Sequence, residues 1–218
     1  MTLGDVVILA TRNKGKIAEF SLLAASCGFL VQGLPDECAE VEESGATFAE
    51  NARLKAASAA AGTGRLAIAD DSGLEVDALD KAPGVRSARY SEGPRGPDTD
   101  RRNWEKLLAA LQGIPLKERT ARFRCALAAC SPQGACLAVQ GVWEGLIALE
   151  PSGENGFGYD PVFFDPVLGR TAASLSREEK NLHSHRARAL AALLRKWPSF
   201  RRSLRLYPLS PNQPPGRL

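Results

Sequence analysis

The stretch LAIADDSGLEVDAL, residues 66–79, places two adjacent aspartates between two apolar segments. Residues 66–69 have the composition of a buried β-strand, which we expect to end at Asp70 and Asp71. Ligands of α/β sheets bind at the carboxyl ends of strands. Neighbouring side chains of an extended chain point to opposite sides, so one carboxylate can face a ligand while the other holds the loop. The stretch therefore predicts a site that suits Mg²⁺, or, as the simpler alternative, an Asx-type turn.

The segments around this stretch alternate between strand and helix patterns, which predicts one α/β domain with a mixed sheet. Strands are expected at residues 6–10, 28–34, 66–69, 119–130 and 135–142, with extended chain to 147 and a short strand near 161–164. Helices are expected from about residue 16 to 27, from 48 to 61, over 104–111 and from 177 to 197. Capping boxes at Thr47–Glu50 and Ser176–Glu179 begin two of these helices.

Composition limits the classes of protein to consider. The chain has 218 residues with a net charge of +3, which fits one domain at residues 1–197 and does not favour a nucleic-acid partner. A basic, proline-rich tail follows at 198–218. No apolar run approaches the roughly 18 residues of a membrane span, and no secretory leader is visible, so we expect a cytoplasmic protein. Five cysteines without a C-x-x-C pair predict free thiols rather than zinc or a disulfide framework.

The loop TRNKGK, residues 11–16, lies between an expected strand and an expected helix. Unpaired backbone amides at a helix start bind phosphate well. Thr11 and Asn13 add neutral donors, and Lys14 and Lys16 add positive charge. The spacing is not that of a Walker loop. The segment therefore predicts either a phosphate site or an ordinary solvated loop.

The segment EESGATFAENARLKA carries Glu42 and Glu43 just before a helix, where acidic residues favour the helix dipole. Asn51 and Lys55 are four residues apart and share one face of that helix. Taken alone, the segment favours a surface ion–dipole pair.

The segment GENGFGYDP places Phe157 and Tyr159 on either side of Gly158. Aromatic faces on a flexible backbone suit stacking on a planar base, whereas the alternative is a packed turn in which Tyr159 caps the edge of the core.

The segment EEKNLHSHRARAL brings Lys180, His185 and Arg186 to the start of a helix. The two basic side chains suit a phosphate or a base carbonyl. His183 and His185 are two residues apart and cannot share one helix face for a metal. A solvated helix face is the alternative.

Six segments, taken in order, carry a family resemblance that covers residues 6–194. They are ILATRNKGKIAEF, EESGATFAENARLKA, ADDSGLEVDAL, PGVRSARYS, GFGYDPVFF and EEKNLHSHRARAL. Together they resemble the inosine/xanthosine triphosphate pyrophosphatases. The resemblance implies an elongated α/β fold, with a long twisted mixed sheet and two lobes around a central cleft. It also implies a homodimer, Mg²⁺, and hydrolysis of ITP, dITP and XTP to the monophosphate and pyrophosphate.

The resemblance also assigns roles to individual residues. Asp71 is implied as general base and metal ligand, Glu42 as a second metal carboxylate, and Asp70 as support. The implied contacts to phosphate or substrate are Thr11, Arg12, Asn13, Lys14, Gly15, Lys16, Lys55, Ser72 and Lys180. The implied contacts to the base are Phe157, Gly158, Tyr159 and Asp160, with His185 and Arg186 reading the purine 6-keto edge.

Three other functions compete with this one. A Maf-like pyrophosphatase acting on modified pyrimidine triphosphates is disfavoured by the segments SHR and FGYDP. A nucleic-acid-binding module that stacks bases on Phe157 and Tyr159 is disfavoured by the near-neutral charge. A catalytically silent scaffold is disfavoured by the full set of candidate site residues.

Overall fold

The computed structural model describes residues 6–12, 17, 20–21, 30–39, 41–94 and 96–206. Its seven strands form one sheet in the order β2-β1-β3-β4-β5-β6-β7. The strands are β1 (Val6–Leu9), β2 (Leu30–Gly33), β3 (Ala67–Val76), β4 (Thr120–Cys130), β5 (Cys136–Ile147), β6 (Phe163–Asp165) and β7 (Arg170–Thr171). The helices are α2 (Phe48–Thr63), α3 (Thr99–Ala110), α4 (Arg177–His183) and α5 (His185–Leu206), and a 3₁₀ helix spans Gly84–Arg89. The first expected helix, over 16–27, lies mostly outside the described residues.

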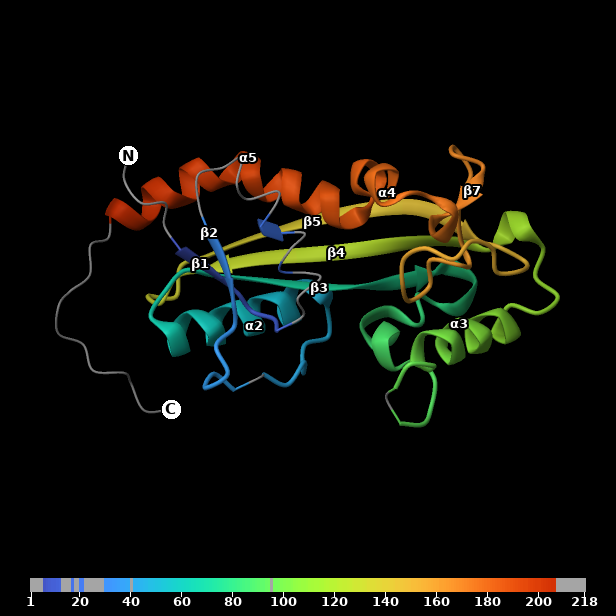
Figure 1. Cartoon of the computed structure of the whole chain (residues 1–218), viewed down its shortest axis with the longest axis horizontal. Coiled ribbons are helices and arrows are strands. Elements are labelled where there is room, and N and C mark those ends of the chain that lie inside the picture. Colours follow the sequence, from blue (N-terminus) through green and yellow to red (C-terminus); the bar gives the residue numbers. More distant parts are fainter. Residues whose placement is uncertain are drawn as a thin grey trace.

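The sheet is mixed, which confirms the predicted α/β fold. β1 pairs parallel with β2 and β3, whereas the pairs from β3 to β7 are antiparallel. Figure 1 shows β3, β4 and β5 running along an elongated molecule. Helix α2 packs on one face of these strands. Helices α5 and α3 pack on the other face, one toward each end of it. None of the helices in the described ranges is both long and apolar enough to cross a membrane.

Strand β4 shows how the two faces are covered. The side chains of Phe123, Cys125 and Leu127 lie on one face of the strand. Cys125 and Leu127 are part of the core that α5 covers. Ala126 and Ala128 point the other way and pack against α2, whose own buried residues are mostly alanines. Small side chains on both surfaces let helix and sheet approach closely. Helix α2 therefore lies over the first half of β3 and the second half of β4.

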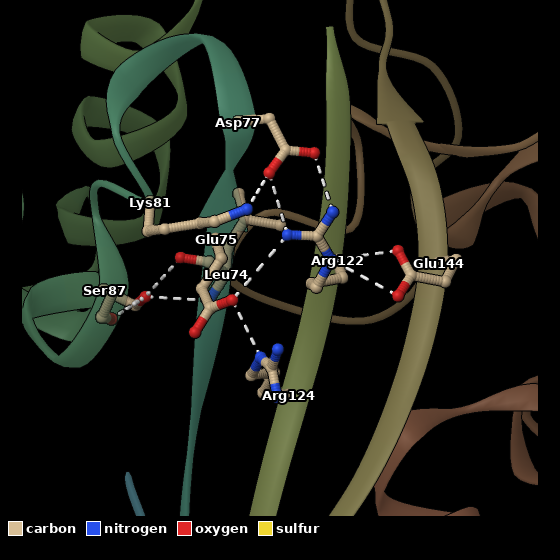
Figure 2. Close-up of polar contacts among 9 residues, drawn as sticks. Leu74, Glu75, Asp77, Lys81, Ser87, Arg122, Arg124 and Glu144 are labelled. Atoms are coloured by element: carbon tan, nitrogen blue, oxygen red, sulfur yellow. Dashed lines mark hydrogen bonds and ion pairs between the residues drawn. The ribbon is translucent and has the colours of Figure 1, made fainter. Parts of the chain in front are cut away.

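Beyond the N-terminal end of α2, the face of the sheet that this helix covers carries paired charges instead (Figure 2). The Arg122 guanidinium lies 2.7 Å from Asp77 and 3.0 Å from Glu144. The Arg124 guanidinium lies 2.7 Å from Glu75. Ion pairs between neighbouring strands add modestly to sheet stability. They also hold the pKa of the Asp77 carboxyl well below its usual range, Arg122 being the main cause.

The expectation that the third strand ends at the aspartate pair is wrong. β3 continues through Val76, and Asp70 and Asp71 pair with Leu127 and Ala126 of β4. The alternative prediction, an Asx-type turn at these aspartates, is wrong for the same reason. The element that stops here is β1, which pairs with β3 only up to Leu9↔Ile68. The aspartates thus lie within β3 but just past the carboxyl end of its parallel neighbour β1. The carboxyl ends of parallel strands are where α/β sheets bind ligands.

The last helix also differs from the expectation of one helix from 177 to about 197. The chain breaks at Ser184, which has extended backbone angles, and α5 then continues through Pro198 to Leu206. Phe200 is buried against Trp197, so the first part of the expected tail packs in the core. Residues 207–218 lie outside the described ranges, and the division into domain and tail stays a prediction.

The expectation of free thiols is wrong for one pair. Cys130 and Cys136 lie opposite each other in the β4–β5 ladder and form a disulfide. Cys38 has a free thiol, and Cys27 lies outside the described residues. A cross-strand pair depends on the register of a hairpin, which a search for C-x-x-C spacing does not detect.

Candidate functional site

Two adjoining hollows form a cleft over β3, and both are lined by Glu43 and Lys55. The Phe157 hollow, of about 250 Å³, also receives Asp71, Ser72 and Arg186. The Thr11 hollow, of about 200 Å³, also receives Asp70. A ligand lying in both hollows would pass directly by the Lys55 ammonium group.

The centre of the cleft is a set of hydrogen bonds around Asp71. Lys55 Nζ donates to Asp71 Oδ1 at 3.0 Å and to Glu43 Oε1 at 2.9 Å. Asn51 Nδ2 donates to Asp71 Oδ2 at 3.1 Å. Asn51 and Lys55 lie one turn apart on α2, which begins at the predicted Thr47–Glu50 capping box. Their interpretation as a surface pair is wrong: Asn51 is fully buried, and both side chains fix the orientation of one carboxylate.

Glu43, rather than Glu42, lies in the cleft. Glu42 is exposed, whereas Glu43 contacts Lys55 and lies 4.0 Å from the Arg89 guanidinium. The two residues lie between β2 and α2 in a segment without regular secondary structure, where the Ser44 N–H donates to the Glu42 carbonyl across Glu43. The geometry therefore favours transferring to Glu43 the role that the resemblance assigned to Glu42.

Electrostatics make Asp71 a stronger base than an ordinary aspartate. Burial raises the pKa of its carboxyl above the usual 3.8, and the Lys55 and Asn51 hydrogen bonds only partly oppose this. Burial alone would lower the pKa of Lys55, but the attraction of Asp71, Glu43 and Asp70 raises it above 10.5. At neutral pH the lysine is therefore cationic.

We expect replacement of Asn51 with alanine to move the acid limb of the pH profile of kcat/KM to higher pH. The amide stabilises the ionised form of Asp71, so its loss raises the pKa of that carboxyl further. Leu54→Ala, an exposed change on the same helix, is the control. An acid limb that stays in place, or moves to lower pH, contradicts the assignment of that limb to Asp71.

At the other end of the cleft, Phe157 is the exposed aromatic residue of the 157–160 loop. Its side chain is 57% exposed, and the charged groups of Lys180 and Arg186 each lie 5.0 Å from the ring centroid. Asp160 Oδ2 accepts a 2.8 Å bond from the Phe157 N–H and pairs with Lys180. The family resemblance implies that Lys180 contacts phosphate. In the structure it contacts Phe157 and Asp160 of the 157–160 loop instead.

Tyr159 is packed rather than open, as the alternative interpretation of this segment expects. It is 4% exposed, and its hydroxyl donates to the Ser87 carbonyl at 2.8 Å. Burial raises the pKa of the phenol well above its usual range. Tyr159 thus anchors the loop whose exposed face is Phe157.

Arg186 links the aromatic loop to β3. Its Nη2 donates to Ser72 Oγ at 3.1 Å, and its Nε lies 3.7 Å from Asp70 Oδ2. The supporting role predicted for Asp70 thus has a physical counterpart: it lies beside the guanidinium that faces the Phe157 ring.

His185 is buried in the wall of the Phe157 hollow and stacks on Phe123 with ring centroids 4.8 Å apart. Burial, with the nearby charges of Arg186 and Lys180, lowers its pKa well below 6.5, so the ring is neutral. Its Nδ1 has no hydrogen-bond partner among the described residues. An unpaired buried nitrogen is costly, so a ligand that supplies a partner would be favoured.

The predicted phosphate loop is described only in part. Thr11 lines the Thr11 hollow. Arg12 instead donates to the carbonyls of Pro35, Asp36 and Cys38 at 2.6–3.2 Å and so holds that turn. The roles of Asn13, Lys14, Gly15 and Lys16 lie outside the described residues and stay predictions.

Gly141 is a site residue that the sequence analysis missed. A Cβ atom at this position of β5 would lie 2.1 Å from the His185 carbonyl and 2.3 Å from the Ala189 nitrogen. Only glycine lets α5 approach so closely and bring His185 and Arg186 to the cleft. Glycine inside a strand pattern can mark such an approach, and that signal was available in the sequence.

Comparison with known proteins gives consistent matches over almost the whole chain. The model of the Ham1 family matches residues 7–196. The dITP/XTP pyrophosphatase of Nitratidesulfovibrio vulgaris is 54% identical, over 89% of this chain and 96% of that protein. The dITP/XTP pyrophosphatase of Geobacillus kaustophilus is 50% identical, over 88% of this chain and 93% of that protein. The solved structure of a HAM1 protein from Coxiella burnetii superposes with a TM-score of 0.82 at 42% identity, over 89% of this chain and 98% of that one.

Proposed function

Because this chain belongs to the Ham1 family, we propose that it hydrolyses the non-canonical purine triphosphates dITP, ITP and XTP to the monophosphate and pyrophosphate. The observation that carries the proposal is the Asp71 carboxylate in the Phe157 hollow, held on both oxygens, one of them by the Lys55 that lines both hollows. The base would occupy the Phe157 hollow and the phosphates would extend toward Thr11. The Maf-like alternative receives no support, since the matched relatives named above are dITP/XTP pyrophosphatases.

The chemistry follows from the residue types in the cleft. Asp71 orients a water molecule and takes its proton as the water attacks the α-phosphorus, while the bond from that phosphorus to the bridging oxygen breaks and pyrophosphate leaves. The Lys55 ammonium stabilises the negative charge that develops on the phosphate oxygens. Both groups are already fixed by α2, so little reorganisation is needed when substrate binds.

We propose Mg²⁺ as the cofactor, held by Asp71 and Glu43. The two carboxylates fit this ion because both contact the same Lys55 nitrogen, so their oxygens already converge on one cation. In the described residues no group of three or more His, Cys, Asp or Glu side chains could hold a metal. Mg²⁺ commonly binds through few carboxylates plus substrate phosphates and would neutralise phosphate charge here. Weak binding without nucleotide is therefore expected.

Selectivity follows from the donors at the Phe157 hollow. Hypoxanthine and xanthine carry a carbonyl at position 6, which can accept from Arg186, whereas adenine presents an amine there. Sites built to hydrogen-bond one group reject an analogue that leaves donors unpaired.

We expect Arg186→Ala to narrow the ratio of kcat/KM for ITP to that for ATP by about 5- to 150-fold, since one unpaired buried polar group costs about 1–3 kcal/mol. Steady-state assays with both nucleotides measure the ratio. Arg188→Ala is the matched control, because Arg188 donates to the Val142 carbonyl outside the cleft. An unchanged ratio in Arg186→Ala would remove this residue from base recognition.

The direct test of the function is pyrophosphate release from dITP, ITP and XTP, with ATP and modified pyrimidine triphosphates in parallel. The proposal expects rapid release from the first three alone, and turnover of the pyrimidine nucleotides instead would favour the Maf-like activity.

A homodimer, a cytoplasmic location and the lack of a nucleic-acid partner stay predictions. The part of the β3, β4 and β5 face that no described helix covers supports the dimer, because the alternating charges of Glu75, Arg122 and Glu144 could be matched by a second copy about a two-fold axis (Figure 2).

A further inference from the structure

Helix α3 presents two polar side chains to the cleft from one face. Asp100 and Asn103 are three residues apart in its first turns and both line the Phe157 hollow. Asn103 is buried: its Oδ1 accepts from the Ser91 N–H at 2.7 Å, and its Nδ2 donates to the Ser87 carbonyl at 3.3 Å. This half of the pair is a fixed part of the fold.

The buried side of the 157–160 loop is tied to the same point. The Tyr159 hydroxyl donates to the Ser87 carbonyl, and Ser87 Oγ accepts from the Leu74 N–H of β3 at 2.9 Å (Figure 2). Tyr159, Asn103 and Ser87 therefore form a hydrogen-bonded unit that anchors one end of the loop to the sheet.

The exposed side of the loop is tied by Asp100. Its Oδ2 accepts a 2.7 Å hydrogen bond from the Gly158 N–H, joining segments 58 residues apart. Gly158 has φ +63°, a left-handed conformation that suits glycine and sets the direction of this amide. Asp100 is an exposed side chain, so this tie can be removed without opening the core.

The position of Phe157 depends on its backbone, because its ring is mostly exposed. The N–H of Phe157 donates to Asp160 within the same loop, and the N–H of Gly158, the next residue, donates to Asp100 of α3. Without Asp100 the exposed end of the loop, at Phe157 and Gly158, can shift relative to α3 while the Tyr159 anchor persists.

We propose that Asp100 is a positioning residue that holds the Gly158 amide and thereby sets where Phe157 meets the substrate base. The inference rests on the proposed function of the Phe157 hollow. It assigns to α3, an element remote in sequence from the other site residues, the placement of the base-binding surface.

Two variants and a matched control test this. Asp100→Ala removes the acceptor, and Asp100→Asn keeps a carbonyl oxygen at the same place. Asp98→Ala removes a neighbouring exposed acid that only pairs with Arg101 at the helix start. Amide hydrogen exchange at Gly158, followed by NMR, reports the tie without any substrate, and dITP kinetics report its effect on binding.

In Asp100→Ala we expect Gly158 exchange about 10-fold faster and KM for dITP about 5- to 10-fold higher, with kcat within about 2-fold of the parent value. In Asp100→Asn, the Gly158 exchange rate and the KM for dITP should both return most of the way to the parent values. Asp98→Ala should match the parent in both. Unchanged Gly158 exchange, or faster exchange with unchanged KM, would overturn the proposal. If dITP is not turned over by the parent protein, the proposed function fails, whereas the exchange result still decides whether Asp100 holds the loop.

Discussion

Asp71→Asn is expected to abolish turnover of dITP while the nucleotide still binds. The amide has nearly the shape of the carboxylate but cannot take a proton from water, and loss of a general base costs about 10²–10⁴ in rate. One amide oxygen can still accept from Lys55, whereas the amide nitrogen faces the Asn51 donor and loses that bond. We therefore expect kcat to fall at least about 10²-fold and Kd to change by less than about 10-fold.

Single-turnover rates and calorimetric titration with dITP separate the two effects. Asp80→Asn, which removes one acidic charge from an exposed turn after β3, is the control and should behave like the parent. A kcat near the parent value in Asp71→Asn would show that another group is the base.

Gly141→Ala is expected to produce the largest loss of stability. The new methyl group would collide with the backbone of α5 at His185 and Ala189, and backbone atoms cannot turn aside as a flexible side chain can. Forced overpacking of this kind costs about 1–3 kcal/mol or more. For a chain of this size, 3 kcal/mol lowers Tm by about 6–12 °C.

Thermal unfolding measures this effect, and dITP kinetics should show a loss of activity as well, because α5 begins with His185 and Arg186. Gly62→Ala is the control: it lies in α2, its Cβ would have ordinary contact with Cys38 at 3.6 Å, and alanine favours a helix. A Tm for Gly141→Ala within about 2 °C of the parent would contradict the close approach of β5 and α5.

Local patterns predicted the elements whose signals lie within a few residues. Both capping boxes, at Thr47–Glu50 and Ser176–Glu179, are present as expected. The alternating apolar pattern of β4 located that strand to within one residue at its start. These features depend on neighbours along the chain, which a sequence displays directly.

Features that depend on distant partners could not be read in this way. The extension of β3 through Asp70 and Asp71 follows from its antiparallel pairing with β4, about fifty residues further along the chain. The disulfide between Cys130 and Cys136 follows from hairpin register. The choice between Glu42 and Glu43 depends on which of the two side chains the turn before α2 directs toward Lys55.

The candidate site divides in the same manner. The motifs brought attention to Asp71, Lys55, Phe157 and Arg186, and the structure gathers these four around one hollow. Asp100 contributes a single contact to a backbone amide on a distant loop. A tie of that kind has no signature in composition or spacing, so only the folded chain reveals it.

The central claim is cleavage of a purine triphosphate between its α and β phosphates, with preference for a 6-keto base. It is tested most directly by incubating the protein with dITP and Mg²⁺, and separately with dATP, and quantifying every product. The account predicts one pyrophosphate for each dIMP, no orthophosphate, and far slower reaction of dATP. Release of orthophosphate with dIDP, or equal rates for the two nucleotides, would contradict it.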